Sequence, residues 1–182
     1  DPVRIEQFLM AAFTVIDHEE LTGSVASWTS TTIPSSYDHL LLEVSARQDG
    51  SYHAVNCYFT VNGAVDYGNT NLTASTSTPA SARAAGYDYI DVMHTPAASA
   101  TADTFGAISV WIPNYANTAN FKPMIMRAAS ENASTTNAQW NLALVAGLWN
   151  STAAITSITL DAYGSDNFVQ YSTFTLYGVT GA

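Results

Sequence analysis

The chain has 182 residues, of which 47% are hydrophobic and 11% are charged, and its formal net charge is −10. Five basic residues face fifteen acidic ones, so the chain lacks the clustered cations with which proteins bind nucleic acids and anionic membranes, and we expect neither partner. The single cysteine, Cys57, excludes an internal disulfide, and its apolar neighbours at period-two spacing predict a buried side chain.

The N-terminal segment carries two competing patterns. Its apolar residues recur at helical spacing: Ile5, Phe8, Leu9, Ala12, Phe13 and Ile16. However, FTVID also fits a strand with Phe13 and Val15 on one side. We therefore predict an N-terminal arm or short helix over residues 1–22 that enters a strand near Phe13. The sequence shows no basic region followed by an apolar core, so we expect no signal peptide, and no apolar run is long enough to cross a bilayer.

From residue 39 onward, most segments alternate apolar and polar side chains, as half-buried strands do. In HLLLEVSAR, one face carries Leu40, Leu42, Val44 and Ala46. HAVNCYFTV is a predicted strand followed by Asn62-Gly63, the commonest signal of a tight β-hairpin. Five further strands share the alternation: around Tyr87 to Met93, and in TFGAISVWIPNY, NFKPMIMRAA, AQWNLALVAGLW and AAITSITLDAY. Pro123 indicates an edge strand or a bulge, because proline cannot donate to a ladder.

Two tracts of small polar residues are predicted as loops: NGAVDYGNTNLTASTSTPASARAAG and HTPAASATADT. The chain then closes on FVQYSTFTLYGVTGA, which has no charge. Chain ends are usually polar and frayed unless they are packed. We therefore predict an inner strand that places Phe174 and Leu176 in the core, with Gly178 and Gly181 against a crowded surface.

About eight short strands separated by turn signals predict an all-β fold, an antiparallel jelly-roll β-sandwich over residues 23–182 that follows the arm. The DHEE cluster, residues 17–20, is interpreted as a solvated turn, and DAYGSDN, residues 161–167, as a hairpin turn rather than a calcium loop. No histidine pair has zinc-site spacing, and no nucleophile or phosphate-binding motif is present in the sequence. We expect no enzyme activity, no catalytic residue, no cofactor and no metal site.

The aromatic residues leave two interpretations open. Four tryptophans and ten tyrosines are enough to build a sugar-stacking platform on a sandwich. The favoured interpretation is that tryptophans belong to the core and tyrosines to the rim or an interface, where an apolar ring with one polar end is useful.

Several stretches taken together resemble one family. They are SWTSTTIPSSYDHLLLEVSAR, NCYFTVNGAVDYGNTNL, ISVWIPNYANTANFKPMIMRAAS, GLWNSTAAITSITL and YSTFTLYGV. In this order they are similar to the jelly-roll structural proteins of tailed bacteriophages, which include capsid decoration (cement) proteins and minor virion proteins. The resemblance covers most of the chain from about Ser24 onward and carries over no catalytic residue.

The resemblance implies a virion protein, made in the cytoplasm of a host bacterium, whose partner is the major capsid protein on the capsid surface. Because strands so poor in charge need their edges covered, we also expect a homo-oligomer, a trimer. The expected interface residues are Ile5, Phe8, Leu9, Phe13, Tyr115 and Tyr177. The alternative is a carbohydrate- or receptor-binding β-sandwich module on a phage tail or a secreted protein.

Overall fold

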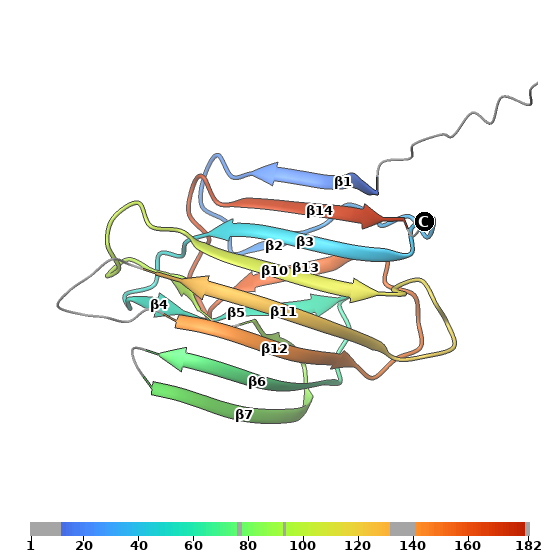
Figure 1. Cartoon of the computed structure of the whole chain (residues 1–182). Coiled ribbons are helices and arrows are strands. Elements are labelled where there is room, and N and C mark those ends of the chain that lie inside the picture. Colours follow the sequence, from blue (N-terminus) through green and yellow to red (C-terminus); the bar gives the residue numbers. More distant parts are fainter. Residues whose placement is uncertain (1–11, 76–77, 93, 132–140, 181–182) are drawn as a thin grey trace, which may run out of the picture.

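The computed structural model of the chain describes residues 12–75, 78–92, 94–131 and 141–180 (Figure 1). These residues form fourteen strands and no helix, which confirms the all-β prediction. Within the same residues, we find no helix of the length and apolar character that spanning a bilayer requires.

Eight strands form one large antiparallel sheet. In spatial order they are β1 (Phe13–Glu20), β14 (Thr173–Val179), β3 (His39–Ala46), β10 (Gly106–Pro113), β11 (Lys122–Ser130), β12 (Asn141–Trp149), β6 (Tyr67–Ser75) and β7 (Thr78–Tyr87). A second sheet has the order β2 (Ser27–Thr29), β13 (Ile158–Ala162), β5 (Cys57–Val61) and β8 (Ile90–Asp91). The short strands β4 (Ala54–Val55) and β9 (Thr95–Pro96) pair with each other.

The two main sheets pack face to face as the layers of a β-sandwich, with the smaller sheet behind the larger one in Figure 1. The predicted alternation is confirmed in β3 and β10, whose inward side chains are buried. In the closing strand, Phe174 and Leu176 are fully buried, as predicted, because their face of β14 packs against the small sheet. Cys57 is buried in the same core. The jelly-roll connectivity stays a prediction.

The turn at Asn62-Gly63 is present, but it does not make a hairpin. Asn62 and Gly63 have φ angles of 55° and 60°, and the amide of Ala64 donates to the carbonyl of Val61 at 2.9 Å. The strand before this turn, β5, belongs to the small sheet, whereas the strand after it, β6, belongs to the large sheet. The prediction of a hairpin was wrong because a tight turn determines local direction and leaves the choice of strand partner to the core.

The long tract predicted as a loop forms strands β6 and β7 instead. Their pairing runs from Tyr67↔Tyr87 to Ser75↔Thr78. Nearly every residue of β7 is exposed, and in Figure 1 these two strands extend beyond the smaller sheet. Because β7 buries neither face, its sequence shows no apolar alternation, and this is why the pattern failed to predict a strand.

Two further local predictions were wrong. Pro123 lies in β11, which is an interior strand of the large sheet. The ladder between β10 and β11 runs only from Ala107↔Ala129 to Trp111↔Ile125. Pro123 lies beyond this ladder, so its lack of an N–H group removes no hydrogen bond to β10. The DHEE cluster forms the end of β1 and not a turn. Its Asp17 carboxylate accepts a hydrogen bond from the amide of Thr31 at 2.7 Å.

The N-terminal segment enters a strand at Phe13, as predicted. Strand β1 pairs with β14 along its whole length, with an irregularity between Val15 and Asp17. Residues 13–20 therefore belong to the large sheet, although the sequence groups them with the arm of residues 1–22. The helical spacing through Phe13 and Ile16 does not produce a helix there, and residues 1–11 lie outside the described part of the chain.

Candidate functional site

The most unusual surface is the side of the large sheet turned away from the small sheet, which we call the outer face. Cross-strand neighbours on it form a row across six strands: Val15, Tyr177, Leu41, Trp111, Ile125 and Ala146. Every member of this row is apolar or aromatic. Across these six strands the row lacks the polar side chains that normally cover the solvent side of an antiparallel sheet, and it reaches polar residues only at Thr70 and Arg83 on β6 and β7.

Two groups of exposed side chains stand out on the outer face. The first, the leucine patch, consists of Leu72, Ile125, Leu142 and Leu144, which are 59%, 47%, 60% and 42% exposed. The second, the edge patch, consists of Phe13, Val15 and Tyr177. In the edge patch the rings of Phe13 and Tyr177 meet edge to face with centroids 6.3 Å apart. Contiguous exposed apolar groups of this kind mark interaction surfaces in folded proteins.

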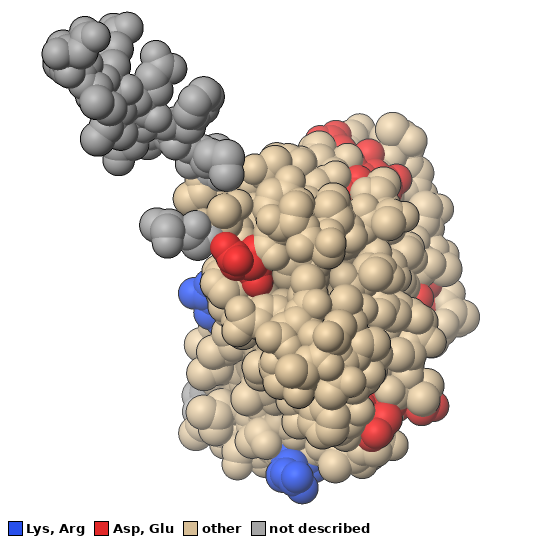
Figure 2. Space-filling view, turned by 90° about the vertical axis from the view of Figure 1, so that its right-hand side faces the viewer, with Lys and Arg blue, Asp and Glu red and all other residues tan. Residues whose placement is uncertain are grey.

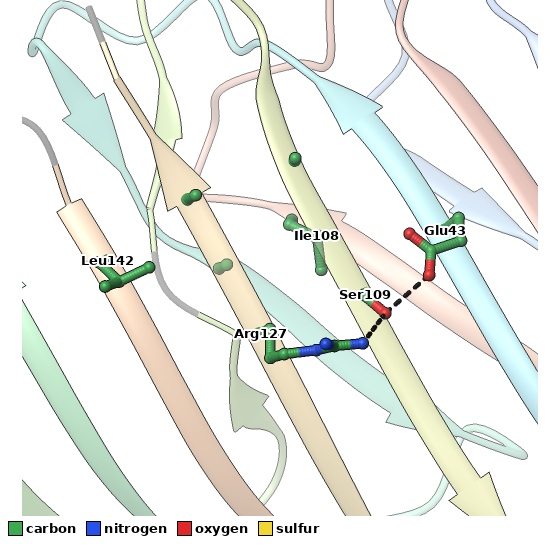
Figure 3. Close-up of a pocket in the computed structure, with 8 residues that line it drawn as sticks. Glu43, Ile108, Ser109, Arg127 and Leu142 are labelled. Carbon is green, nitrogen blue, oxygen red and sulfur yellow. Dashed lines mark hydrogen bonds between the residues drawn. The ribbon is translucent and has the colours of Figure 1, made fainter.

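Between the two patches lies a short polar relay (Figure 3). Glu43, Ser109 and Arg127 are direct cross-strand neighbours on β3, β10 and β11. The Ser109 hydroxyl donates to Glu43 Oε1 at 2.7 Å, and Arg127 Nη2 donates to Ser109 Oγ at 3.3 Å. The carboxylate and the guanidinium are thus linked within the chain, so a partner can cover them without supplying a charge of its own.

Two shallow hollows flank Arg127. One, of about 330 Å³, lies over the relay and reaches Ala107, Ala129 and Leu142, as Figure 3 shows in part. The other, of about 370 Å³, lies between Leu72, Leu142 and Leu144. Their walls are mainly apolar, and the only charged side chains that line them are Glu43 and Arg127. Such a mainly apolar lining suits contact with the side chains of a protein partner better than it suits catalysis of a reaction.

Away from the outer face, we consider the thiol and the side chains that could hold a metal ion in the described residues. Burial, followed by the carboxylates of Asp91 and Asp161, raises the pKa of the Cys57 thiol, which keeps it protonated and unreactive. No group of three or more His, Cys, Asp and Glu side chains is placed to hold a metal ion in the described ranges.

Figure 2 shows one side of the molecule, on which few charged side chains interrupt a wide uncharged surface.

The interface residues predicted from the sequence have three different outcomes. Ile5, Phe8 and Leu9 lie outside the described residues. Phe13 and Tyr177 lie together in the edge patch. Tyr115 is fully buried in this chain, where its hydroxyl donates to the carbonyl of Pro34, so we assign it to the core rather than to a surface.

The leucine patch was not predicted, although the sequence holds a signal for it. In NLALVAGLW, Leu142 and Leu144 alternate with Ala143 and Val145, so the strand is apolar on both faces. Such a strand is expected where both faces are covered. The aromatic prediction is confirmed for Trp28 and Trp149, which are buried.

Comparisons with known proteins do not assign this chain to a family. No family model matches the sequence, and no curated protein or solved structure matches it. A proposal about function therefore rests on the surfaces described above.

Proposed function

We propose that this chain is a non-catalytic structural protein of a virion, a capsid decoration protein that assembles with copies of itself through its outer face. The observation that carries the proposal is the leucine patch, an exposed apolar surface on the middle of the large sheet. Burial of apolar area contributes about 25 cal/mol per Å² and is the main favourable term in protein association.

A second copy of this chain is the partner that the surface suits best. The copies each carry a net charge of −10, so they attract one another only where the contact surface is itself close to neutral. The outer face meets this condition because Glu43 and Arg127 are joined through Ser109. Covering the part of this face that holds the relay therefore leaves neither of these two charges without a partner, which is the usual cost of burying ionised groups, whereas Glu20 and Arg83 lie at the two margins of the sheet.

The two patches suit a closed ring of copies. In a ring, each copy presents one surface to its first neighbour and a different surface to its second neighbour. The leucine patch and the edge patch lie at different places on the same sheet, so the leucine patch of one copy can cover the edge patch of the next. A two-fold dimer can also pair these two patches reciprocally, so the mass of the oligomer distinguishes that arrangement from the trimer that we propose.

The action on a capsid would be thermodynamic. A protein that binds an assembled lattice but not its separate subunits stabilises the lattice by mass action. Such a role needs rigid surfaces and no chemistry, which agrees with the buried thiol and with the resemblance of the sequence to phage decoration proteins.

The oligomer tests the proposal first. We expect Leu142→Glu and Leu144→Glu each to convert a trimer into a monomer, measured by light scattering during size-exclusion chromatography, because each places a carboxylate in the contact. The matched control is Val65→Glu, since Val65 is 58% exposed in a turn outside the patches. If the control dissociates the trimer as well, the leucine patch is not the contact.

The capsid role needs its own experiment. Particles of the virus that encodes this chain should show it at repeated positions on the shell by electron cryomicroscopy, and particles that lack it should rupture at a lower temperature. A few copies confined to the tail, or an unchanged rupture temperature, would contradict the decoration role while leaving self-association intact.

A further inference from the structure

The exposed side of the small sheet has the opposite chemistry from the outer face. Across it, Asp161, Tyr58 and Asp91 are direct cross-strand neighbours on β13, β5 and β8. In the next row, the hydroxyls of Thr29 and Thr159 are hydrogen-bonded at 2.9 Å. In these two rows of described residues the side chains are therefore polar or acidic apart from the ring of Tyr58.

Four tyrosine rings from three segments meet at this second face, and we call them the tyrosine platform: Tyr58, Tyr87, Tyr89 and Tyr163. The ring of Tyr58 contacts Tyr89 with centroids 4.1 Å apart and Tyr163 with centroids 5.9 Å apart. Tyr87 meets Tyr89 edge to face at 6.3 Å. Tyr87 and Tyr163, at the two ends of the platform, are 50% and 41% exposed, so rings line a continuous path that is open to solvent.

A small hollow continues this path beyond Tyr163. It has a volume of about 170 Å³ and is lined by Tyr52, Asn56 and Tyr163 together with Ala54 and Val55. The side-chain amide of Asn56 donates to Asp91 Oδ2 at 2.5 Å, which fixes the wall of the hollow to the carboxylate beside Tyr58. Pockets for drug-sized ligands have roughly 300–1,000 Å³, so this hollow holds one ring of a longer ligand that continues over the platform.

We propose that the tyrosine platform and its hollow bind a neutral oligosaccharide. A sugar ring has an apolar C–H face that packs on an aromatic ring, and hydroxyl groups at its edge that donate to carboxylates. Asp91 and Asp161 supply such acceptors on either side of Tyr58, and the same two charges repel anionic sugars. Within the described residues, the Asp161 side chain accepts no hydrogen bond from the protein, so it is available to a ligand.

The site is separate from the proposed self-association surface. Tyr58 lies on the outer side of the small sheet and Tyr87 at the end of β7 on the margin of the large sheet, whereas the leucine patch lies on the far side of the large sheet, so a ring of copies joined through the leucine patch leaves the platform exposed. A trimer would then present three platforms, and the linked sites would bind a polysaccharide more tightly than one site alone. The inference does not depend on the capsid role.

The test uses the full chain on an array of neutral and anionic oligosaccharides, followed by calorimetry with the neutral ligand that binds best. We expect binding to neutral oligosaccharides, and a loss of affinity of about tenfold or more in Tyr52→Ala and in Tyr163→Ala, which corresponds to about 1.4 kcal/mol for each ring. The matched control is Tyr171→Ala, because Tyr171 is 63% exposed but makes no contact with the platform. The control should bind like the unchanged chain.

Three results would overturn the inference: no binding to any neutral oligosaccharide on the array, binding to anionic ones only, or full affinity in both the Tyr52→Ala and the Tyr163→Ala variant. The monomeric Leu144→Glu variant separates this inference from the proposed function. It should keep its intrinsic affinity for a single oligosaccharide even though it no longer assembles.

Discussion

The ring of Phe174 lies parallel to the indole of Trp28, with ring centroids 5.1 Å apart and planes 7° apart. Phe174 belongs to β14 in the large sheet and Trp28 to β2 in the small sheet, so this stack joins the two layers. Phe168 packs edge to face against Phe174 from the segment just before β14. The end of the chain is therefore part of the core contact between the sheets.

The Phe174→Ala substitution should lower the free energy of unfolding by about 3–5 kcal/mol, because it leaves a cavity between the sheets. Urea unfolding followed by circular dichroism measures this loss. Phe121→Ala is the control, since Phe121 is 49% exposed and its removal should cost at most about 1 kcal/mol. Equal losses in the two variants would mean that the stack does not hold the layers together.

Gly178 lies directly against the ring of Tyr37, and a Cβ atom at this position would overlap the ring. Gly178→Ala should therefore cost about 1–3 kcal/mol in unfolding free energy through overpacking. Gly23→Ala is the matched control, because nothing lies within 4 Å of a Cβ atom there. In the double variant with Tyr37→Leu, part of the loss should be restored, and an unchanged loss would place the cause elsewhere.

The Cys57 thiol should resist alkylation in the folded chain. Burial raises its pKa, and the thiolate is the form that reacts. Iodoacetamide labelling followed by mass spectrometry should therefore proceed at the rate at which the whole domain opens, and it should accelerate in Phe174→Ala. Rapid labelling of the native chain, with no dependence on its stability, would contradict this placement of Cys57.

His94 should make stability depend on pH. Burial lowers the pKa of His94 from its ordinary value of 6.5, and within the described residues its Nδ1 atom has no hydrogen-bond partner. Below pH 6.5 His94 is therefore protonated in the unfolded chain, whereas in the folded chain it stays neutral until the pH is lower. The stability that neutral His94 contributes is fully present above that pH and decreases as the pH falls through it.

Urea unfolding at neutral and at mildly acidic pH tests this dependence. His94→Gln, which cannot titrate, should lose less stability on acidification than the unchanged chain. The control is His18→Gln, which changes an exposed histidine whose Nδ1 is hydrogen-bonded to the Thr175 hydroxyl at 2.9 Å, and it should retain the original pH dependence. If acidification lowers the stability of all three proteins equally, His94 is not the cause of the pH dependence.

Arg127→Glu tests the polar relay on the outer face. The substitution replaces the cation beside Ser109 with a second carboxylate close to Glu43, so copies would meet across like charges. We expect the dissociation constant of the oligomer to rise about tenfold or more, measured by sedimentation, with the fold unchanged. Ser27→Glu, which adds a carboxylate on the small sheet, should leave association unaltered, and an equal effect there would point to net charge alone.

Part of this fold follows directly from local pattern. Leu40, Leu42 and Val44 recur at every second position because one face of β3 is covered, and the same reasoning correctly places Phe174 and Leu176. Strand β7 escaped prediction because its small residues are exposed on both faces and leave no alternation, and β6 because the tract that contains it is rich in small polar residues. The partner of β5 escaped prediction because Asn62-Gly63 determines a turn, while the sheet that each strand joins depends on contacts distant in sequence.

The candidate site was predictable only in part. Phe13 and Tyr177 were expected at an interface; they contact each other within the chain at one edge of the sheet, and their place in an interface stays a prediction. The leucine patch was missed because an apolar strand such as NLALVAGLW predicts burial on both faces, and only the strand order shows that nothing in the described part of the chain covers the outer one. Tyr115 was predicted at an interface but is buried, because an aromatic ring with one polar end suits the rim and the core of a sandwich equally.

Self-association through the outer face is the central claim, and sedimentation equilibrium of the purified chain over a wide range of concentration tests it most directly. The account predicts three times the mass of one chain at high concentration, and the mass of one chain for Leu144→Glu under the same conditions. A single-chain mass for the unchanged protein at every concentration would contradict the account.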